Sequence, residues 1–254
     1  YGVNLLPLAT FALETYQDDA CEVFKIRGGN HSYDTSEKAL NMKLHKAISI
    51  IQFKLEGQLV HKYPWFHAED RRVLEKINYD EGTIEIDGTV YPLLDKNFPT
   101  IDPKDPYALS EAEQNVMERL VGAFENCDKL QQHMLLLLNK GSMYKVFNNN
   151  LLYHGCVPLD ENGELRQVEV FGKTYSGKAL YDVLESYVRK AFFEVDEEER
   201  ERGRDIMWFI WSNRNSPLFG KDRMTTFERY FVEDSAVHKE NKNPYYRFLN
   251  DETV

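Results

Sequence analysis

The chain has 254 residues, enough for one large domain or two small ones, and its 42% of hydrophobic residues, with 13% aromatic, supports a packed core. Its 42 acidic and 31 basic residues leave a net charge of −11, which disfavours nucleic acid and anionic membranes as partners, because both attract basic surfaces. No apolar run approaches the length of a membrane span.

The first part of the chain predicts helices. An apolar-periodic stretch ends near Tyr16, and a long helix is expected to begin at Thr35 or Ser36, either of which can cap it. Apolar residues recur at three- and four-residue steps along that helix and form one stripe: Leu40, Leu44, Ala47, Ile48, Ile51, Leu55 and Leu59. Further on, Asp87-Gly88 separates two short strand-like runs, which is the signature of a type I′ hairpin.

The middle of the chain predicts a loop followed by a long helix. Residues 95–109 carry three prolines and several charges, which indicates a loop. Within it, Asp102 and Asp105 fit a solvated turn, with metal ligation as the alternative. Ser110-Glu111-Ala112-Glu113 forms a capping box, and the apolar stripe that follows predicts a helix that continues to Gly141.

The last part of the chain predicts two more hairpins and two more helices. One hairpin is expected from Met143 to Tyr153, and a shorter one around Gly172. Ser176 is expected to cap the next helix. The charged run from Glu194 to Arg204 predicts a solvated helix start, and Met207 to Trp211 a buried aromatic stripe. Several helices among short hairpins indicate an α+β fold.

The strongest candidate for chemistry is His154, which directly follows the hairpin expected from Met143 to Tyr153. Gly155 comes next and lacks a Cβ, so that backbone and ligand can approach closely there. A neutral imidazole at the end of a rigid strand suits a metal ligand. The alternative is a hairpin histidine that bonds a backbone group. Cys156 lies next to the His-Gly pair and could be a nucleophile, but a small buried hydrophobic residue is the simpler interpretation.

The run from Asn150 to Gly163 resembles the class III fructose-1,6-bisphosphatases, which belong to the calcineurin-like metallophosphatases. The resemblance extends over nearly the whole chain, from about Tyr1 to Asn250. Its other segments are long strings rather than three-letter motifs: His45–Glu56, Thr100–Pro106, Leu218–Phe231 and Asn243–Tyr246.

This resemblance implies a metal centre of which the chain carries little. A binuclear phosphatase holds two divalent ions about 3.5–4 Å apart, which together activate a water molecule. The superfamily draws its ligands from Asp-x-His, Gly-Asp-x-x-Asp, Gly-Asn-His and His-Gly runs and a later histidine. Of these, His154 is the expected metal ligand here, and manganese the expected metal. The chain therefore resembles a central fragment, with residues 36–141 as a helical and hairpin insertion and 142–254 as part of an α/β-sandwich phosphatase core.

Two other histidines invite a ligand interpretation. Gly28-Gly29-Asn30-His31 has the form of a Gly-Asn-His run, but in the family that run precedes the segment resembling Gly2–Leu6, so a turn before a helix is the better interpretation. His45 lies beside the apolar stripe of the long helix without a partner ligand four residues away. A hydrogen-bonded helix histidine is expected there.

The substrate that the resemblance implies is a sugar bisphosphate, fructose 1,6-bisphosphate, whose second phosphate needs cations. Lys221 and Arg223 in the loop Phe219–Arg223 are the candidates, one as a point charge and the other as a bidentate fork. The alternative is that both are surface charges near Asp222 and Glu228.

The resemblance implies a metal-dependent phosphatase of gluconeogenesis in its intact form, and an inactive fragment in this chain. Two other functions remain open: a non-catalytic regulatory or interaction module, and a phosphoprotein phosphatase of the same superfamily. The three cysteines are widely spaced, without a Cys-x-x-Cys pair, which is typical of reduced thiols in the cytoplasm. The partner that the resemblance implies is the sugar bisphosphate, neither nucleic acid nor a membrane is expected, and an oligomer remains open.

Overall fold

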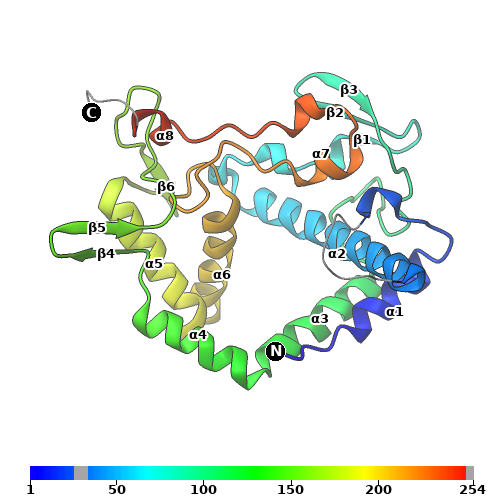
Figure 1. Ribbon diagram of the computed structural model, residues 1–254, viewed down its shortest axis with the longest axis horizontal. Helices are drawn as coiled ribbons and strands as arrows, with labels where there is room; N and C mark the ends of the chain where they lie inside the picture. Colours follow the sequence, from blue (N-terminus) through cyan, green and yellow to red (C-terminus); the bar gives the residue numbers. More distant parts are fainter. Residues whose placement is uncertain (26–33, 250–254) are drawn as a thin grey trace. The chain divides into compact units, whose positions relative to one another are not determined.

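The computed structural model describes residues 1–25 and 34–249, and it contains helices and small antiparallel sheets, so the expected α+β class is confirmed (Figure 1). The chain divides into two compact units. Unit 1 contains Tyr1–Lys62, Asp70–Met134 and Thr225–Lys239, and unit 2 contains Tyr63–Glu69, Leu135–Met224 and Glu240–Val254. None of the described helices has both the length and the apolar character that crossing a bilayer requires.

Unit 1 is built on the long helix α2 (Thr35–Lys62). Helix α1 (Leu6–Thr15) lies against both α2 and α3 (Glu111–Glu125) (Figure 1). Apolar side chains of the three helices form one core, which contains Leu8, Phe11, Ala12, Ala47, Ile51, Val116 and Leu120. Helix α2 begins at Thr35, as predicted, but Asp34 caps it rather than Thr35 or Ser36, because the side chain of Asp34 accepts the N–H of Glu37 at 2.8 Å. The capping box of α3 is confirmed, since the side chains of Ser110 and Glu113 each accept a hydrogen bond from the other's backbone N–H.

The buried side of α2 also contains charged residues, which the apolar stripe does not predict. The ammonium group of Lys54 lies 2.7 Å from the carboxylate of Glu113 on α3 and donates to the carbonyl of Thr100 at 2.6 Å. Lys46 lies between Asp19 and Asp95, at 2.5 and 2.6 Å. Such pairs satisfy one another's charge where water cannot. They tie α2 to segments distant in sequence.

A second core of unit 1 lies between α2 and a three-stranded sheet of β1 (Ile77–Asn78), β2 (Thr83–Ile86) and β3 (Thr89–Pro92). Phe227 and Phe231 of the short helix α7 (Thr226–Phe231) are fully buried in it. Asp87 and Gly88 both have positive φ, as a type I′ turn requires, so the predicted hairpin is confirmed. Single-turn 3-10 helices complete the unit: Glu22–Phe24, Glu69–Arg71, Leu74–Lys76 and Ser235–His238. Of the second of these, the first residue, Glu69, is assigned to unit 2.

Unit 2 has two helices side by side, α5 (Gly177–Phe193) and α6 (Glu197–Ser212) (Figure 1). They approach closely at Gly203, where a Cβ would lie 2.6 Å from the carbonyl oxygen of Tyr187. Two hairpins accompany them, β4 (Tyr144–Phe147) with β5 (Asn150–Tyr153), and β6 (Val168–Val170) with β7 (Lys173–Tyr175). A 3-10 turn (Pro64–Phe66) and α8 (Tyr245–Phe248) complete the unit.

Three details differ from the expectations. The helix predicted to continue to Gly141 is broken at Asn126 and Cys127, and α4 (Asp128–Lys140) follows. Met207 and Trp211 are exposed, because only one side of α6 faces the core. Ser176 occupies the N-cap position of α5 without a side-chain cap bond. The run Gly28-Gly29-Asn30-His31 lies outside the described residues.

Candidate metal and phosphate-binding site

His154 follows β5 directly, as the sequence predicts, and its side chain is exposed. The strand is fixed at this end by tyrosines. Tyr144 and Tyr153 face each other across the hairpin, and both rings meet the ring of Tyr181 on α5 edge to face. The hydroxyl of Tyr153 also forms a hydrogen bond with that of Tyr245. The backbone that carries the imidazole therefore starts from an anchored strand end.

Gly155 is required by a close approach of two backbone segments. Its φ is +88°, and a Cβ there would lie 2.2 Å from the carbonyl oxygen of Pro217 and 2.9 Å from the Cα of Leu218. The next N–H, that of Cys156, donates to the same Pro217 oxygen at 2.7 Å. The glycine was expected to admit a ligand. In the structure it admits the chain's own backbone, which fixes the position of the His154 main chain.

Two tyrosine hydroxyls hold the same segment. Tyr246 donates to the carbonyl of Gly155 at 3.2 Å, and Tyr181 donates to the carbonyl of Cys156 at 2.9 Å. Both hydroxyls are protonated donors at neutral pH, and burial moves the pKa of both tyrosines further above it. Cys156 is fully buried, and burial raises the pKa of its thiol to about 11. A neutral buried thiol is a poor nucleophile, in agreement with its expected role as a small hydrophobe.

The loop that carries Lys221 is held by the segment that follows α7. Gly220 has a φ of +66° and accepts a hydrogen bond from the N–H of Asn243 at 2.9 Å. Lys221 itself forms an antiparallel bridge with Lys242, and its ammonium group lies 2.7 Å from the carboxylate of Glu240. Its carboxylate partner is Glu240. Arg223 is half-buried.

These contacts bring the sequence-predicted segments together in unit 2. Residues 155 and 156 contact Pro217 and Leu218, and a Cβ on Gly220 would lie 2.8 Å from the Tyr246 hydroxyl that bonds Gly155. The side chain of Asn243 accepts hydrogen bonds from the N–H groups of Leu159 and Tyr245. The sequence does not predict that Asn243 and Tyr246 join the segment after His154 to the loop of Lys221, although Asn243–Tyr246 is one of the segments that carry the resemblance.

The metal-ligand set itself is incomplete. Within residues 1–25 and 34–249, no three His, Cys, Asp or Glu side chains gather into a group that could hold a metal ion. Asp102 accepts a bond from the N–H of Lys104 at 2.9 Å, as expected of a turn. His45 bonds the hydroxyl of Tyr230 at 3.0 Å, and burial lowers its pKa, so the expected hydrogen-bonded helix histidine is confirmed.

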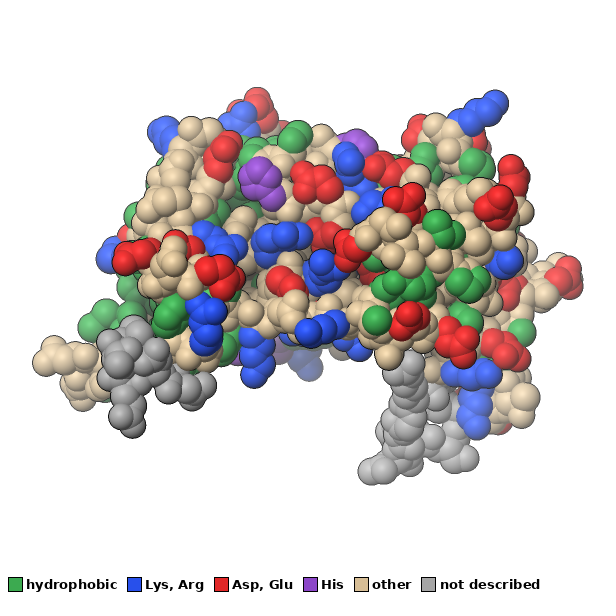
Figure 2. Space-filling view, turned by 90° about the horizontal axis from the view of Figure 1, so that it is seen from above, with side chains coloured by type: hydrophobic (Ala, Val, Ile, Leu, Met, Phe, Trp, Pro, Cys, Tyr) green, Lys and Arg blue, Asp and Glu red, His purple; other side chains and the backbone are tan. Residues whose placement is uncertain are grey.

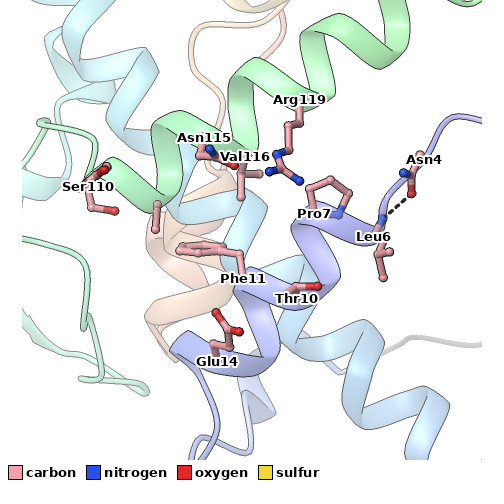
Figure 3. Close-up of a pocket in the computed structure, with 12 residues that line it drawn as sticks. Asn4, Leu6, Pro7, Thr10, Phe11, Glu14, Ser110, Asn115, Val116 and Arg119 are labelled. Atoms are coloured by element: carbon pink, nitrogen blue, oxygen red, sulfur yellow. Dashed lines mark hydrogen bonds between the residues drawn. The ribbon is translucent and has the colours of Figure 1, made fainter.

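A pocket of about 710 Å³ lies in unit 1, apart from these candidates, between α1 and α3 (Figure 3). Phe11 and Val116 form its apolar part, while Arg119, Glu14 and Glu111 contribute charges of both signs. Charges of both signs are also mixed on the surface shown in Figure 2. The pocket lacks the cationic excess that a bisphosphate needs.

The chain is similar to known proteins over its whole length. The family model for Firmicute fructose-1,6-bisphosphatase matches residues 1–254. "Fructose-1,6-bisphosphatase class 3" of Clostridioides difficile (strain 630) is 53% identical over 253 residues, which are 99% of this chain and 38% of that protein. The protein of the same name from Clostridium botulinum (strain Langeland) is 50% identical over 255 residues, or 100% of this chain and 38% of that protein.

No solved structure matches the chain. The chain spans 38% of the length of these curated relatives. The match of the family model covers every residue. Three of the segments that carried the resemblance contribute residues that contact one another in unit 2: Asn150–Gly163, Leu218–Phe231 and Asn243–Tyr246. The chain belongs to the Firmicute fructose-1,6-bisphosphatase family.

Proposed function

We propose that this chain is part of a metal-dependent phosphatase that hydrolyses fructose 1,6-bisphosphate to fructose 6-phosphate and phosphate. The observation that carries the proposal is the family match over residues 1–254. In this proposal the chain supplies one metal ligand, residues that bind the substrate, and the framework that holds them. The isolated chain is expected to be inactive, because it spans 38% of its relatives and its described residues hold no metal-ligand group.

In this proposal His154 supplies one ligand to the metal centre, and the other ligands come from the part of the protein that this chain does not span. A divalent ion such as manganese would polarise the phosphoryl group once such a set is complete. The contribution of the chain's own residues is orientation. The Pro217 carbonyl and the Tyr246 hydroxyl both bond the peptide unit between Gly155 and Cys156, so the imidazole of His154 precedes a fixed stretch of backbone.

Lys221 and Arg223 would bind the phosphate that is not hydrolysed. Lys221 must leave Glu240 to do so, and the free energies allow it. The side chain of Lys221 is 48% exposed and that of Glu240 is 13% exposed, and an ion pair that solvent reaches from the lysine side is worth about 1 kcal/mol. A hydrogen bond to a charged phosphate oxygen is worth about 1.5–3 kcal/mol. A bound phosphate can therefore displace Glu240 from Lys221.

The finer organisation is part of the same proposal. Residues 36–141 would form a helical and hairpin insertion, and residues 142–254 would belong to a calcineurin-like phosphatase core. His154, Lys221 and Arg223 all lie in unit 2, which overlaps the proposed core. We also infer a cytoplasmic enzyme, since all three thiols are free and two of them are fully buried.

The test is phosphate release by the full-length protein with manganese. His154→Ala should remove most turnover of fructose 1,6-bisphosphate, with an unchanged circular dichroism spectrum. His133→Ala is the control, because His133 is an exposed histidine on α4 that bonds Tyr1. Near wild-type turnover of His154→Ala at saturating manganese would show that this histidine is only a hairpin residue. Preference for a phosphopeptide over the sugar would instead favour a phosphoprotein phosphatase.

The second arm tests the cations. Lys221→Ala should reduce turnover of the bisphosphate about ten- to hundredfold, and turnover of nitrophenyl phosphate much less, because the latter has no second phosphate. Lys178→Ala is the control, since Lys178 also pairs with a carboxylate, that of Asp182, on the surface of unit 2. Equal losses on both substrates would place Lys221 at the reacting phosphate, and no loss on either would return it to a surface charge.

A further inference from the structure

The hairpin β4–β5 exposes an unusual amount of apolar surface. Four of its eight strand residues are large and hydrophobic, and their side chains are exposed by between 53% and 63%: Val146, Phe147, Leu151 and Leu152. The segment from Tyr144 to Tyr153 contains a single charged residue, Lys145. Scattered exposed apolar residues are ordinary, but four on one short hairpin form a patch that marks an interaction site.

The apolar residues occupy both faces of the hairpin. Val146 lies directly opposite Leu151, on the face that also carries Tyr144 and Tyr153. Phe147 and Leu152 lie on the other face, because successive side chains of a strand point to opposite sides. Only the base of the first face is covered, by the contact of the two tyrosines with Tyr181. The second face also carries Lys145 opposite Leu152 and Asn150 opposite Phe147, so it is half polar. A hairpin that stays at a surface carries a fully polar face, and neither face of this one is fully polar.

The outer edges of the hairpin are also open. Among the described residues, no backbone hydrogen bond joins Tyr144–Tyr153 to another segment, and the two strands form a sheet by themselves. A two-stranded hairpin is marginally stable in water unless further strands or a helix cover it. Natural edge strands avoid pairing by means of charges, proline or bulges. Lys145 is the single such device between Tyr144 and Tyr153.

We propose that β4–β5 is an internal part of a larger sheet, in which strands from the portion of the polypeptide beyond this chain pair with its edges and other elements of that portion pack on its two faces. The occupant is the remainder of the same protein, because the curated relatives are much longer and this chain spans 38% of their length. The inference rests on the proposed function, which makes the chain one part of a longer phosphatase. It adds that the strand leading to His154 is completed by that remainder.

The inference is tested by cysteine labelling of the full-length protein. Leu151→Cys and Leu152→Cys sample the two faces, and Val195→Cys is the matched control, since Val195 is 90% exposed in the same unit. Labelling with a maleimide is followed by mass spectrometry of the peptides, which separates each new thiol from Cys156 and the other native cysteines. We expect both hairpin thiols to react at least tenfold more slowly than the control.

Hydrogen exchange of the unsubstituted protein gives a second readout that no folding defect of a variant can disturb. Peptides covering residues 144–153 should exchange as slowly as those of α5. Labelling at the rate of Val195→Cys, with fast exchange of the hairpin, would overturn the inference. Protection that disappears on dilution to the monomer would also overturn it, because a second copy would then be the occupant. Neither readout requires turnover, so protection without hydrolysis would reject the proposed function and retain the sheet.

Discussion

The ion pair between Lys54 and Glu113 gives the sharpest stability prediction for unit 1. Both side chains are almost completely buried, at 0% and 1% exposed. Replacing Lys54 with Met keeps the volume and the helix but removes the ammonium group from beside the carboxylate and from the carbonyl of Thr100. Glu113 cannot move away, because its carboxylate also accepts the N–H of Ser110 in the capping box. Breaking a buried pair in this way costs about 3–5 kcal/mol.

The measurement is the free energy of unfolding by urea, on single and double variants. Glu113→Gln preserves the cap but leaves Lys54 with a neutral partner, and it should also destabilise. The double variant Lys54→Met with Glu113→Gln should lose clearly less than the sum of the two single losses, because neither charge is then left alone. A loss below about 1 kcal/mol for Lys54→Met would refute the reasoning, since it would mean that water reaches the pair.

Three further predictions concern the candidate site, acid stability and metal. Gly155→Ala should cost about 2–4 kcal/mol of unfolding free energy, because the new Cβ meets the Pro217 carbonyl at 2.2 Å, whereas Gly172→Ala, with nothing near its Cβ, should cost about 1–2. Burial opposes ionisation of Asp19, but hydrogen bonds, of which that from Lys46 is the strongest, lower its pKa in the folded protein below the ordinary value of 3.8. The stability that the ionised Asp19 contributes is therefore complete above pH 3.8 and is lost as the pH falls through the pKa of the folded protein. The acid unfolding of Asp19→Asn, followed by circular dichroism, should therefore depend less on pH. Calorimetric titration of residues 1–254 with manganese should show no binding tighter than roughly micromolar, because one imidazole supplies too few bonds.

The local elements of this fold could be predicted because their determinants are local. The turn residues Asp87-Gly88, Asn148-Asn149 and Phe171-Gly172 all have positive φ in the structure, and each connects the two strands of a hairpin. The capping box at Ser110 likewise depends on residues within one turn of helix. Such turns and caps depend on a few neighbouring residues, so packing against distant parts of the chain does not alter them.

The interior of α2 could not be predicted, because it depends on residues distant in sequence. The apolar stripe suggested a helix with one buried side, yet Lys46, Lys54 and Glu56 are buried as well. Their partners come from segments up to 59 residues away, as with Glu113. A lysine on a helix is usually solvated, and nothing within one turn of Lys54 indicates otherwise. The break of the predicted helix at Cys127 could not be predicted either, because the apolar stripe resumes on α4 and so looks continuous in the sequence.

The candidate site combines both kinds of information. The end of a strand at His154 follows from the hairpin pattern, but the contacts that fix it come from Pro217 and Tyr246, more than sixty residues further along the chain. The strand is thus firmly held on the side that this chain supplies and open on its outer edges and apolar faces. A metal ligand gains from rigidity on all sides, because the ion tolerates little displacement. We propose that the other half of the support comes from the same part of the protein as the remaining ligands, so that the sheet and the metal centre are completed together.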